Sequence, residues 1–139
     1  MTSPIRVGLM GFGRIGRNVF RQLEETPGIE VAAIADTADP AGLVYLLEFD
    51  TIFGRFPGDV ELDGSDLVVN GRRVPILDGA EPGDVDWGSH DVEIVVQATR
   101  KHRTLTECRR HRGRRWLGCR RRRPSPGVDQ RSKTNAVSC

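Results

Sequence analysis

The chain has 139 residues, and its 21 Lys and Arg against 19 Asp and Glu give a formal net charge of +2 at pH 7. This length suits one domain or a piece of a larger protein. No stretch of about 18 apolar residues predicts a transmembrane helix, and the N-terminus lacks the basic and apolar segments of a secretion signal. The three cysteines all come late, which favours a reducing, cytoplasmic location over a disulfide framework.

The small net charge hides an uneven distribution. Residues 1–99 contain 7 basic residues (Lys and Arg) and 17 acidic residues (Asp and Glu), a net charge of −10. Residues 100–139 contain 14 basic and 2 acidic residues, a net charge of +12. Such asymmetry indicates two different kinds of segment. We expect one folded domain over residues 1–108 and an atypical, irregular or disordered Arg-rich tail over residues 109–139.

The first predicted unit is a strand, a glycine-rich turn and a helix. The apolar run Ile5 to Met10 leads into Gly11-x-Gly13-x-x-Gly16, and the helix that follows has one apolar face, formed by Ile15, Val19, Phe20 and Leu23. At a dinucleotide site, the first glycine permits the tight turn. The second lets a pyrophosphate approach the backbone, and the third lets the helix pack closely on the strand. The N–H groups at the helix N-terminus would bind the phosphates.

A second strand and an acidic residue complete this pattern. Pro27-Gly28 ends the helix, and the apolar run Val31 to Ala35 predicts a parallel strand that leads to Asp36. Asp36 lies 20 residues after Gly16, where a carboxylate can accept hydrogen bonds from the adenosine ribose hydroxyls. The same carboxylate repels a 2′-phosphate. The sequence therefore predicts a Rossmann-type α/β fold that binds NAD in preference to NADP, rather than an ordinary glycine-rich turn.

The middle of the chain predicts a short helix and an antiparallel meander. Asp39-Pro40 supplies an N-cap and a first helical residue, and residues 49–58 are predicted to form a loop. Asp63-Gly64 and Asn70-Gly71 are turn dipeptides between short apolar runs in residues 59–77. We expect these strands to form a meander inserted into a mostly parallel sheet.

The next parallel strand is predicted over Val92 to Ala98, after a solvated connection over residues 78–89. Trp87 in this connection is expected to pack in the core rather than to contact a ligand. Ligands of such sheets bind outside the carboxyl ends of the strands, and Thr99 stands at this end. Thr104-x-x-Glu107 forms a capping box, so a helix should begin near Thr104.

Several of these motifs occur together in a distinctive order. They are Gly11 to Asn18, Tyr45 to Thr51 with Gly54 to Gly58, Val68 to Gly71, and Val95 to Thr99. Their order and spacing resemble phosphorylating glyceraldehyde-3-phosphate dehydrogenase over about residues 5 to 108. Erythrose-4-phosphate dehydrogenase shares much of this pattern and stays open as an alternative.

The resemblance implies an NAD-dependent oxidoreductase of glycolysis, whose full-length members are homotetramers. In this family a cysteine thiolate attacks the aldehyde, a histidine acts as base, and inorganic phosphate releases the acyl group. Membrane and nucleic-acid partners are not expected. The expected cofactor contacts are the pyrophosphate-binding turn, the ribose-binding acid and the residue after the last strand, namely Gly11, Gly13, Arg14, Ile15, Gly16, Asp36 and Thr99.

No catalytic residue is assigned in this chain. The family's catalytic domain is expected to begin near where the sequence stops, so we expect an NAD-binding fragment without turnover. Cys139 lies in a sequence similar to that around the family's nucleophile, but it follows too soon after residue 124. His90, His102 and His111 do not match the family's base and are expected on the solvated surface.

Two residues near the expected site depart from the family pattern. Most members have Asn where this chain has Met10, so a polar contact would be lost. Members usually have Gly after the threonine, where this chain has Arg100. This large side chain would either obstruct the site or point to solvent.

The Arg-rich tail has no counterpart in the family. Residues 109–123 contain nine arginines among fifteen residues and keep no apolar face. One hypothesis is a reading-frame error, because arginine codons of the CGN type, read one nucleotide later, begin with G and encode residues such as Ala and Val. The alternative is a basic segment that neutralises nucleic-acid phosphates, with only Trp116 available for base stacking.

Two further expectations concern the same segment. Cys108, His111 and Cys119, with His102 as a further candidate, invite a zinc site. Only Cys108 and His111 have a tight spacing and the ligand set is incomplete, so no metal is expected. The buried strand that the family has near residues 117–123 is expected to be missing. Its loss would leave one edge of the sheet unpaired.

Overall fold

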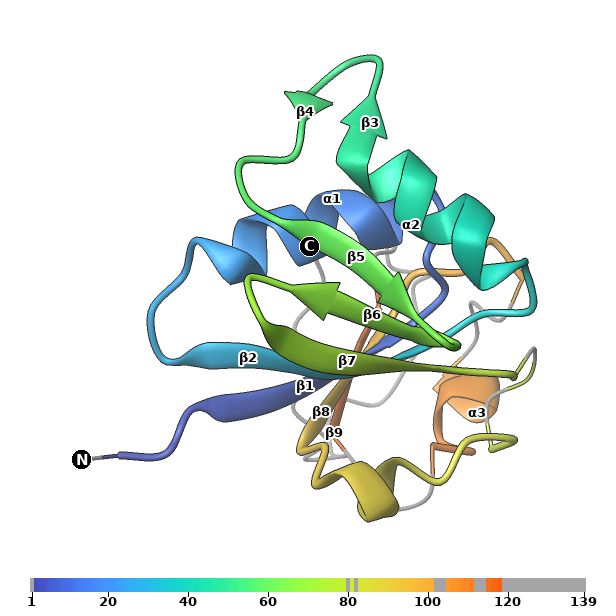
Figure 1. Ribbon diagram of the computed structural model, residues 1–139. Helices are drawn as coiled ribbons and strands as arrows, with labels where there is room; N and C mark the ends of the chain where they lie inside the picture. The colour runs from blue at the N-terminus through green and yellow to red at the C-terminus, as the bar shows by residue number, and fades with distance from the viewer. Residues whose placement is uncertain (1, 80, 82, 102–104, 112–114, 119–139) are drawn as a thin grey trace.

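The computed structural model describes residues 2–79, 81, 83–101, 105–111 and 115–118. Seven strands form the main sheet in the order β5-β6-β7-β2-β1-β8-β9. They are β1 (Ile5–Met10), β2 (Ile29–Ala35), β5 (Val60–Asp63), β6 (Asp66–Val69), β7 (Arg72–Leu77), β8 (Ile94–Gln97) and β9 (Arg115–Gly118). The helices α1 (Arg14–Glu24) and α2 (Pro40–Glu48) lie on one side of this sheet. The 3-10 helix η1 (Trp87–His90) and the short helix α3 (Leu105–Cys108) lie on the other side (Figure 1).

The predicted strand–helix–strand unit and the meander are both present. β1 pairs in parallel with β2 and with β8, and β2 pairs in parallel with β7. The middle strand of the meander, β6, runs antiparallel to both β5 and β7. At their turns, Gly64 and Asn70 have positive φ angles of 64° and 50°, which Gly and Asn tolerate better than other residues. The Rossmann-type fold with an inserted antiparallel meander is therefore confirmed.

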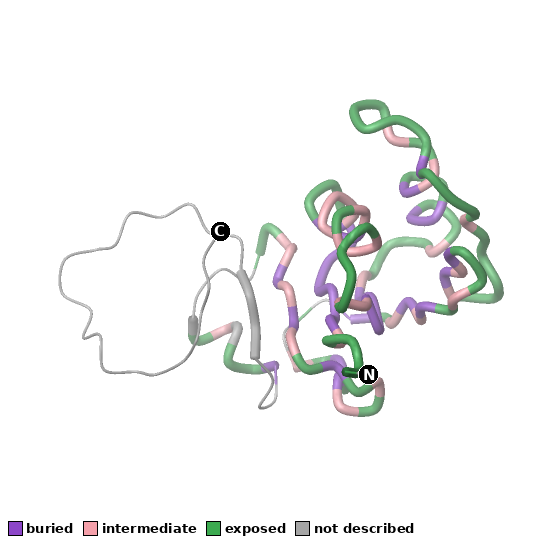
Figure 2. The backbone as a smooth tube through the Cα atoms, turned by 90° about the vertical axis from the view of Figure 1, so that its left-hand side faces the viewer, coloured by how far each residue is buried: buried purple, intermediate pink, exposed green. Residues whose placement is uncertain are grey.

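The core consists of two apolar clusters, one on each side of the main sheet. Leu9 and Met10 are neighbours on β1, so their side chains point to opposite faces. Leu9 packs with Phe20 of α1 and Leu47 of α2, whereas Met10 packs with Trp87 of η1. Figure 2 shows the buried residues gathered in the middle of the described fold. Trp87 is 2% exposed, which confirms the prediction that it packs in the core.

Residues 49–58 form more regular structure than the predicted loop. They contain a two-stranded sheet of β3 (Phe49–Asp50) and β4 (Gly54–Arg55). The Asp50 carboxylate stabilises the connecting turn, because its Oδ1 accepts hydrogen bonds from the backbone N–H groups of Ile52 and Phe53 at 2.7 and 2.8 Å. A side chain of this type can direct a turn without a glycine at its centre.

The expectation that the last sheet edge is unpaired is wrong for β8. β9 lies parallel beside it in the register Ile94↔Arg115 to Gln97↔Gly118. Backbone N–H and C=O groups are carried by almost every residue, so this pairing does not require the apolar pattern that the sequence lacks. Residues 112–114 and 119–139 of the tail and Thr104 lie outside the described residues. Within the described part of the chain, no helix has the length and apolar character needed to cross a membrane.

Candidate functional site

The glycine motif forms a tight turn between β1 and α1. Gly11 has a φ of +96°, a conformation that residues with a Cβ rarely adopt. A Cβ added at Gly16 would lie 2.1 Å from the Gly11 carbonyl oxygen, whereas a Cβ at Gly13 would meet nothing within 4 Å. Gly16 therefore permits close packing of the helix on the turn, and Gly13 borders open space. These are the separate roles that the sequence predicts for the two glycines.

The N-terminus of α1 is left available to an anion. Its N-cap residue, Gly13, makes no side-chain cap hydrogen bond, and the first turn contains no acidic residue. The first N–H groups of a helix have no partner within the helix, and the helix dipole places partial positive charge there. Phosphate groups bind at such helix ends.

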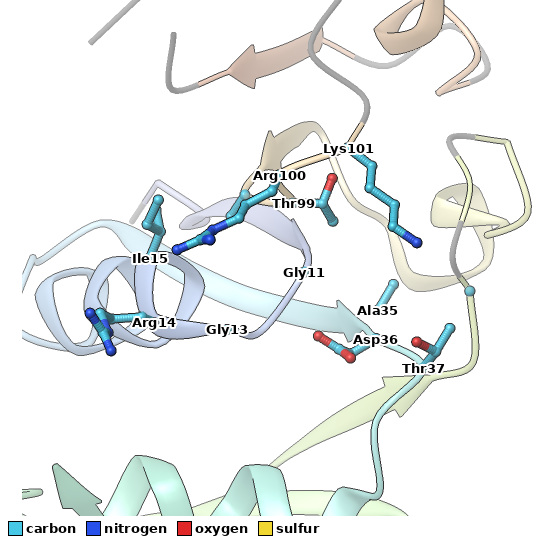
Figure 3. A pocket seen from close by; sticks show the side chains of 12 residues that line it. Gly11, Gly13, Arg14, Ile15, Ala35, Asp36, Thr37, Thr99, Arg100 and Lys101 are labelled. Carbon is cyan, nitrogen blue, oxygen red and sulfur yellow. The ribbon is translucent and has the colours of Figure 1, made fainter. Parts of the chain in front are cut away.

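A cavity of about 540 Å³ opens at the carboxyl ends of β1, β2 and β8, beside this helix end. Its size falls in the range of small-molecule sites, about 300–1,000 Å³. Its lining comes from four segments far apart in the sequence, and Figure 3 shows this cavity from close by. The lining residues are Gly11, Gly13, Arg14, Ile15, Ala35, Asp36, Thr37, Gly79, Ala98, Thr99, Arg100 and Lys101.

The charges around this cavity are mostly positive. Arg14, Arg100 and Lys101 line it, with Asp36 as the single acid among the lining residues. The stretch from residue 1 to 99 carries a net charge of −10, so this local excess of cations is distinctive. Cations beside a helix N-terminus favour a ligand with negatively charged groups.

Asp36 connects the glycine turn to the end of β2. Its Oδ2 accepts a hydrogen bond from the Phe12 N–H at 2.7 Å, and its Oδ1 accepts one from the Ala38 N–H at 2.9 Å. Each carboxylate oxygen has a further lone pair, and the side chain lies at the cavity in Figure 3. The carboxylate is therefore held in place by the backbone and can still accept hydrogen bonds from a ligand.

Thr99, Arg100 and Lys101 reach the cavity from the segment after β8. Figure 3 shows Arg100 directed toward Ile15 and Lys101 directed toward the side of Ala35 and Thr37. Arg100 is exposed and lies at the rim rather than in the core. The sequence patterns did not predict Lys101 as a site residue, although its position shortly after a predicted strand could have indicated it.

Comparison with known proteins decides the family. The sequence model described as "Glyceraldehyde 3-phosphate dehydrogenase, NAD binding domain" matches residues 5–105. The chain belongs to this family. The domain it contains is the one that binds NAD, and the family consists of oxidoreductases.

Individual relatives agree with this assignment. The chain is 43% identical to glyceraldehyde-3-phosphate dehydrogenase 1 of Bacillus subtilis over 95 residues, 68% of this chain and 28% of the relative. It is 43% identical to glyceraldehyde-3-phosphate dehydrogenase 2 of Trichoderma koningii over 110 residues, 78% of this chain and 32% of the relative. It is 42% identical to the cytosolic glyceraldehyde-3-phosphate dehydrogenase of Trypanosoma brucei brucei over 95 residues, 68% of this chain and 29% of the relative. The chain thus spans less than a third of these relatives. They do not favour the erythrose-4-phosphate dehydrogenase or nucleic-acid alternatives.

The structure of this NAD-binding domain brings most predicted site residues together. Six of them line the cavity, namely Gly11, Gly13, Arg14, Ile15, Asp36 and Thr99. Gly16 is not among the lining residues and packs behind the turn. Ile15 does not join the core as its spacing predicted, because it is 47% exposed and lies at the cavity.

Met10 has a structural rather than a ligand-facing position in this domain. Its side chain is 0% exposed and belongs to the cluster on the far face of the sheet. The cavity lining does not include it. Because position 10 does not line the cavity, having Met there instead of Asn takes no polar group away from the cavity surface.

His111 is not on the surface, which corrects the expectation from sequence. Its side chain is 1% exposed. Its Nδ1 accepts a hydrogen bond from Trp87 Nε1 at 3.2 Å, and its Nε2 lies 2.8 Å from Gln97 Oε1. The segment after α3 returns to the sheet and buries this ring, which local sequence does not reveal. Among the described residues, no group of three or more His, Cys, Asp and Glu side chains could hold a metal ion. His102 and Cys119 of the considered zinc site lie outside them.

Proposed function

We propose that this chain binds NAD in the cavity at the ends of β1, β2 and β8. The backbone of the turn around Gly11 and Gly13, with Arg14 and Ile15, contacts the pyrophosphate, Asp36 accepts hydrogen bonds from the adenosine ribose, and Thr99 lies beside the cofactor. Gly16 supports the turn from behind. One observation carries the proposal: open backbone at Gly13, an uncapped helix N-terminus and a ligand-facing carboxylate share one cavity.

The chemistry of the cavity suits a dinucleotide. The helix end and the cations Arg14, Arg100 and Lys101 complement a pyrophosphate. The carboxylate of Asp36 complements free ribose hydroxyls and repels a 2′-phosphate. NAD supplies the hydride acceptor of the reaction, and the residues named here bind and orient it.

Calorimetric titration of the purified chain with NAD tests this proposal. We expect saturable binding, which Asp36→Ala weakens by about ten- to a hundredfold, because hydrogen bonds to charged groups contribute about 1.5–3 kcal/mol. Asp39→Ala is the matched control. It also removes an aspartate, but Asp39 caps α2 through Gly42 N–H and does not line the cavity. Absence of wild-type binding, or equal losses in both variants, would contradict the proposal.

We further propose that residues 1–108 belong to the cofactor domain of a phosphorylating glyceraldehyde-3-phosphate dehydrogenase, on which His111 and β9 also pack. Cytoplasmic location and homotetramer formation by the whole protein belong to the same proposal, and one relative is itself named cytosolic. The 139 residues alone are expected to bind NAD without turnover, because none of them is assigned as the nucleophile or the base.

An activity assay tests the expectation that the 139 residues bind NAD without turnover. The chain is mixed with glyceraldehyde 3-phosphate, inorganic phosphate and NAD, and NADH absorbance is followed. No NADH should form at concentrations where calorimetry shows that NAD is bound. Phosphate-dependent NADH formation would show that the chain contains a complete catalytic centre.

A further inference from the structure

A buried chain of hydrogen bonds leads from the core to the cavity. Trp87 Nε1 donates to His111 Nδ1 at 3.2 Å, His111 Nε2 lies 2.8 Å from Gln97 Oε1, and Gln97 Nε2 donates to Thr99 Oγ1 at 2.5 Å. Trp87, His111 and Gln97 are 2%, 1% and 4% exposed. Thr99 is the member that lines the cavity. Three segments distant in sequence thus meet behind one residue of the cavity lining.

The chemistry of these groups allows only one donor-to-acceptor direction along the series of hydrogen bonds. An indole N–H can only donate, so His111 Nδ1 must be the acceptor and carries no proton. A neutral imidazole then has its proton on Nε2, which donates to the Gln97 oxygen. That orients the Gln97 NH₂ group toward Thr99. A protonated imidazolium would place a second N–H against the indole N–H, so this arrangement requires a neutral ring.

The direction of these hydrogen bonds determines whether the Thr99 hydroxyl can donate a hydrogen bond to a ligand. Its oxygen is occupied as an acceptor by the Gln97 NH₂ group. The hydroxyl hydrogen must then point away from Gln97, because a hydrogen directed at the NH₂ group would meet another donor. The side chain already lies at the cavity wall.

We propose that this series of buried hydrogen bonds holds the Thr99 hydroxyl as a donor to an oxygen of the bound dinucleotide, with Gln97 and His111 as positioning residues. The inference rests on the proposed function, since it needs the cofactor in this cavity. A donor that is oriented before binding costs less conformational entropy when the ligand arrives. The buried groups therefore contribute to affinity without touching the ligand.

Reversing the polarity of one member tests the inference. In Gln97→Glu, an ionised carboxylate accepts from both His111 and Thr99, so the Thr99 hydrogen turns inward and only lone pairs face the cavity. We expect NAD affinity to fall about three- to tenfold, the loss of one ordinary hydrogen bond. Because a protonated carboxyl can still donate to Thr99, the loss should increase as the pH rises. Gln97→Met, which removes both hydrogen-bonding groups, should also lower affinity.

A double-mutant cycle separates this role from a general effect on the fold. Thr99→Val removes the hydroxyl and should lower NAD affinity by a similar factor, whereas Thr99→Ser should retain it. In the Thr99→Val background, Gln97→Glu should cause no further loss. An equal loss from Gln97→Glu with and without the hydroxyl would overturn the inference while leaving NAD binding established.

Nitrogen-15 NMR of the histidine rings gives a second readout that needs no ligand. His111 should show a neutral ring with its proton on Nε2, and the shift of the Trp87 indole N–H should change in Gln97→Met. A proton on Nδ1, or a charged ring at neutral pH, would overturn the inference whether or not NAD binds. Failure of the wild-type chain to bind NAD would overturn the proposed function and this inference together.

Discussion

Two glycines of the same motif have different physical roles, and substitution separates them. Gly13→Ala should leave the fold nearly unchanged, at a cost below about 1 kcal/mol, because its Cβ would meet nothing within 4 Å. It should nevertheless weaken NAD binding about tenfold or more, since the methyl group occupies space proposed for the pyrophosphate.

Gly16→Ala should show the opposite behaviour. Alanine gains up to about 1 kcal/mol of helix propensity over glycine, but its Cβ would lie 2.1 Å from the Gly11 carbonyl oxygen. Backbone atoms cannot move aside cheaply, so we expect a net destabilisation of about 1–3 kcal/mol. Urea unfolding of both variants, beside NAD titration, measures the contrast. Equal stability of the two variants would show that the turn relaxes around the new methyl group.

The charge of Asp36 is predicted to select between cofactors. Asp36→Asn keeps an oxygen acceptor of similar shape but removes the negative charge that faces the cavity. We expect the ratio of NAD to NADP affinity to fall about tenfold or more, because repulsion of the 2′-phosphate is lost. The ratio is informative because damage to the fold would lower both affinities together. An unchanged ratio would place the adenosine ribose elsewhere.

At the scale of elements, side chains at helix ends connect the helices to the sheet. Glu24, the last residue of α1, forms an ion pair with Arg72 of β7, and Arg72 also donates to the Val31 carbonyl oxygen at 2.7 Å. Burial raises the pKa of Glu24, Arg72 lowers it, and Glu30 raises it, with a net upward direction. The ionised form is therefore less favoured in the folded chain than in the unfolded chain.

This pKa direction gives a pH prediction for Glu24→Gln. When the pKa of an acid is raised on folding, its contribution to stability is complete below its ordinary pKa of 4.5 and is lost as the pH rises through the folded value. The variant should therefore gain stability relative to wild type as the pH rises above 4.5. Denaturant unfolding across this range measures the difference. A relative loss for the variant would show that attraction by Arg72 outweighs burial.

At the scale of the whole molecule, β9 completes the sheet although its sequence looks unsuitable. Its backbone pairs with β8 over four residue pairs. A chain ending at residue 118 keeps every described element, whereas one ending at residue 111 loses β9 and exposes the edge of β8. The shorter chain should be at least about 1 kcal/mol less stable, or about 4–8 °C lower in Tm, and should aggregate more readily. Thermal melts with light scattering compare the two. Equal melting would mean that β9 contributes no stability.

The buried position of His111 also limits the reading-frame hypothesis. This ring contacts both Trp87 and Gln97 through hydrogen bonds, a fit that a residue from a wrong frame would match only by chance. Any change of frame is therefore expected after codon 111, and sequencing independent clones of the gene checks this.

The sequence alone determined the elements whose signals are local. The strand–glycine–helix unit, the Asp39 cap and the turns at Gly64 and Asn70 follow from side-chain period and backbone preference within a few residues. Only the tertiary structure decided the pairing of β9, the exposure of Ile15 and the burial of His111. These depend on which distant segments meet, and local sequence does not carry that information, because burial and strand pairing are set by long-range packing.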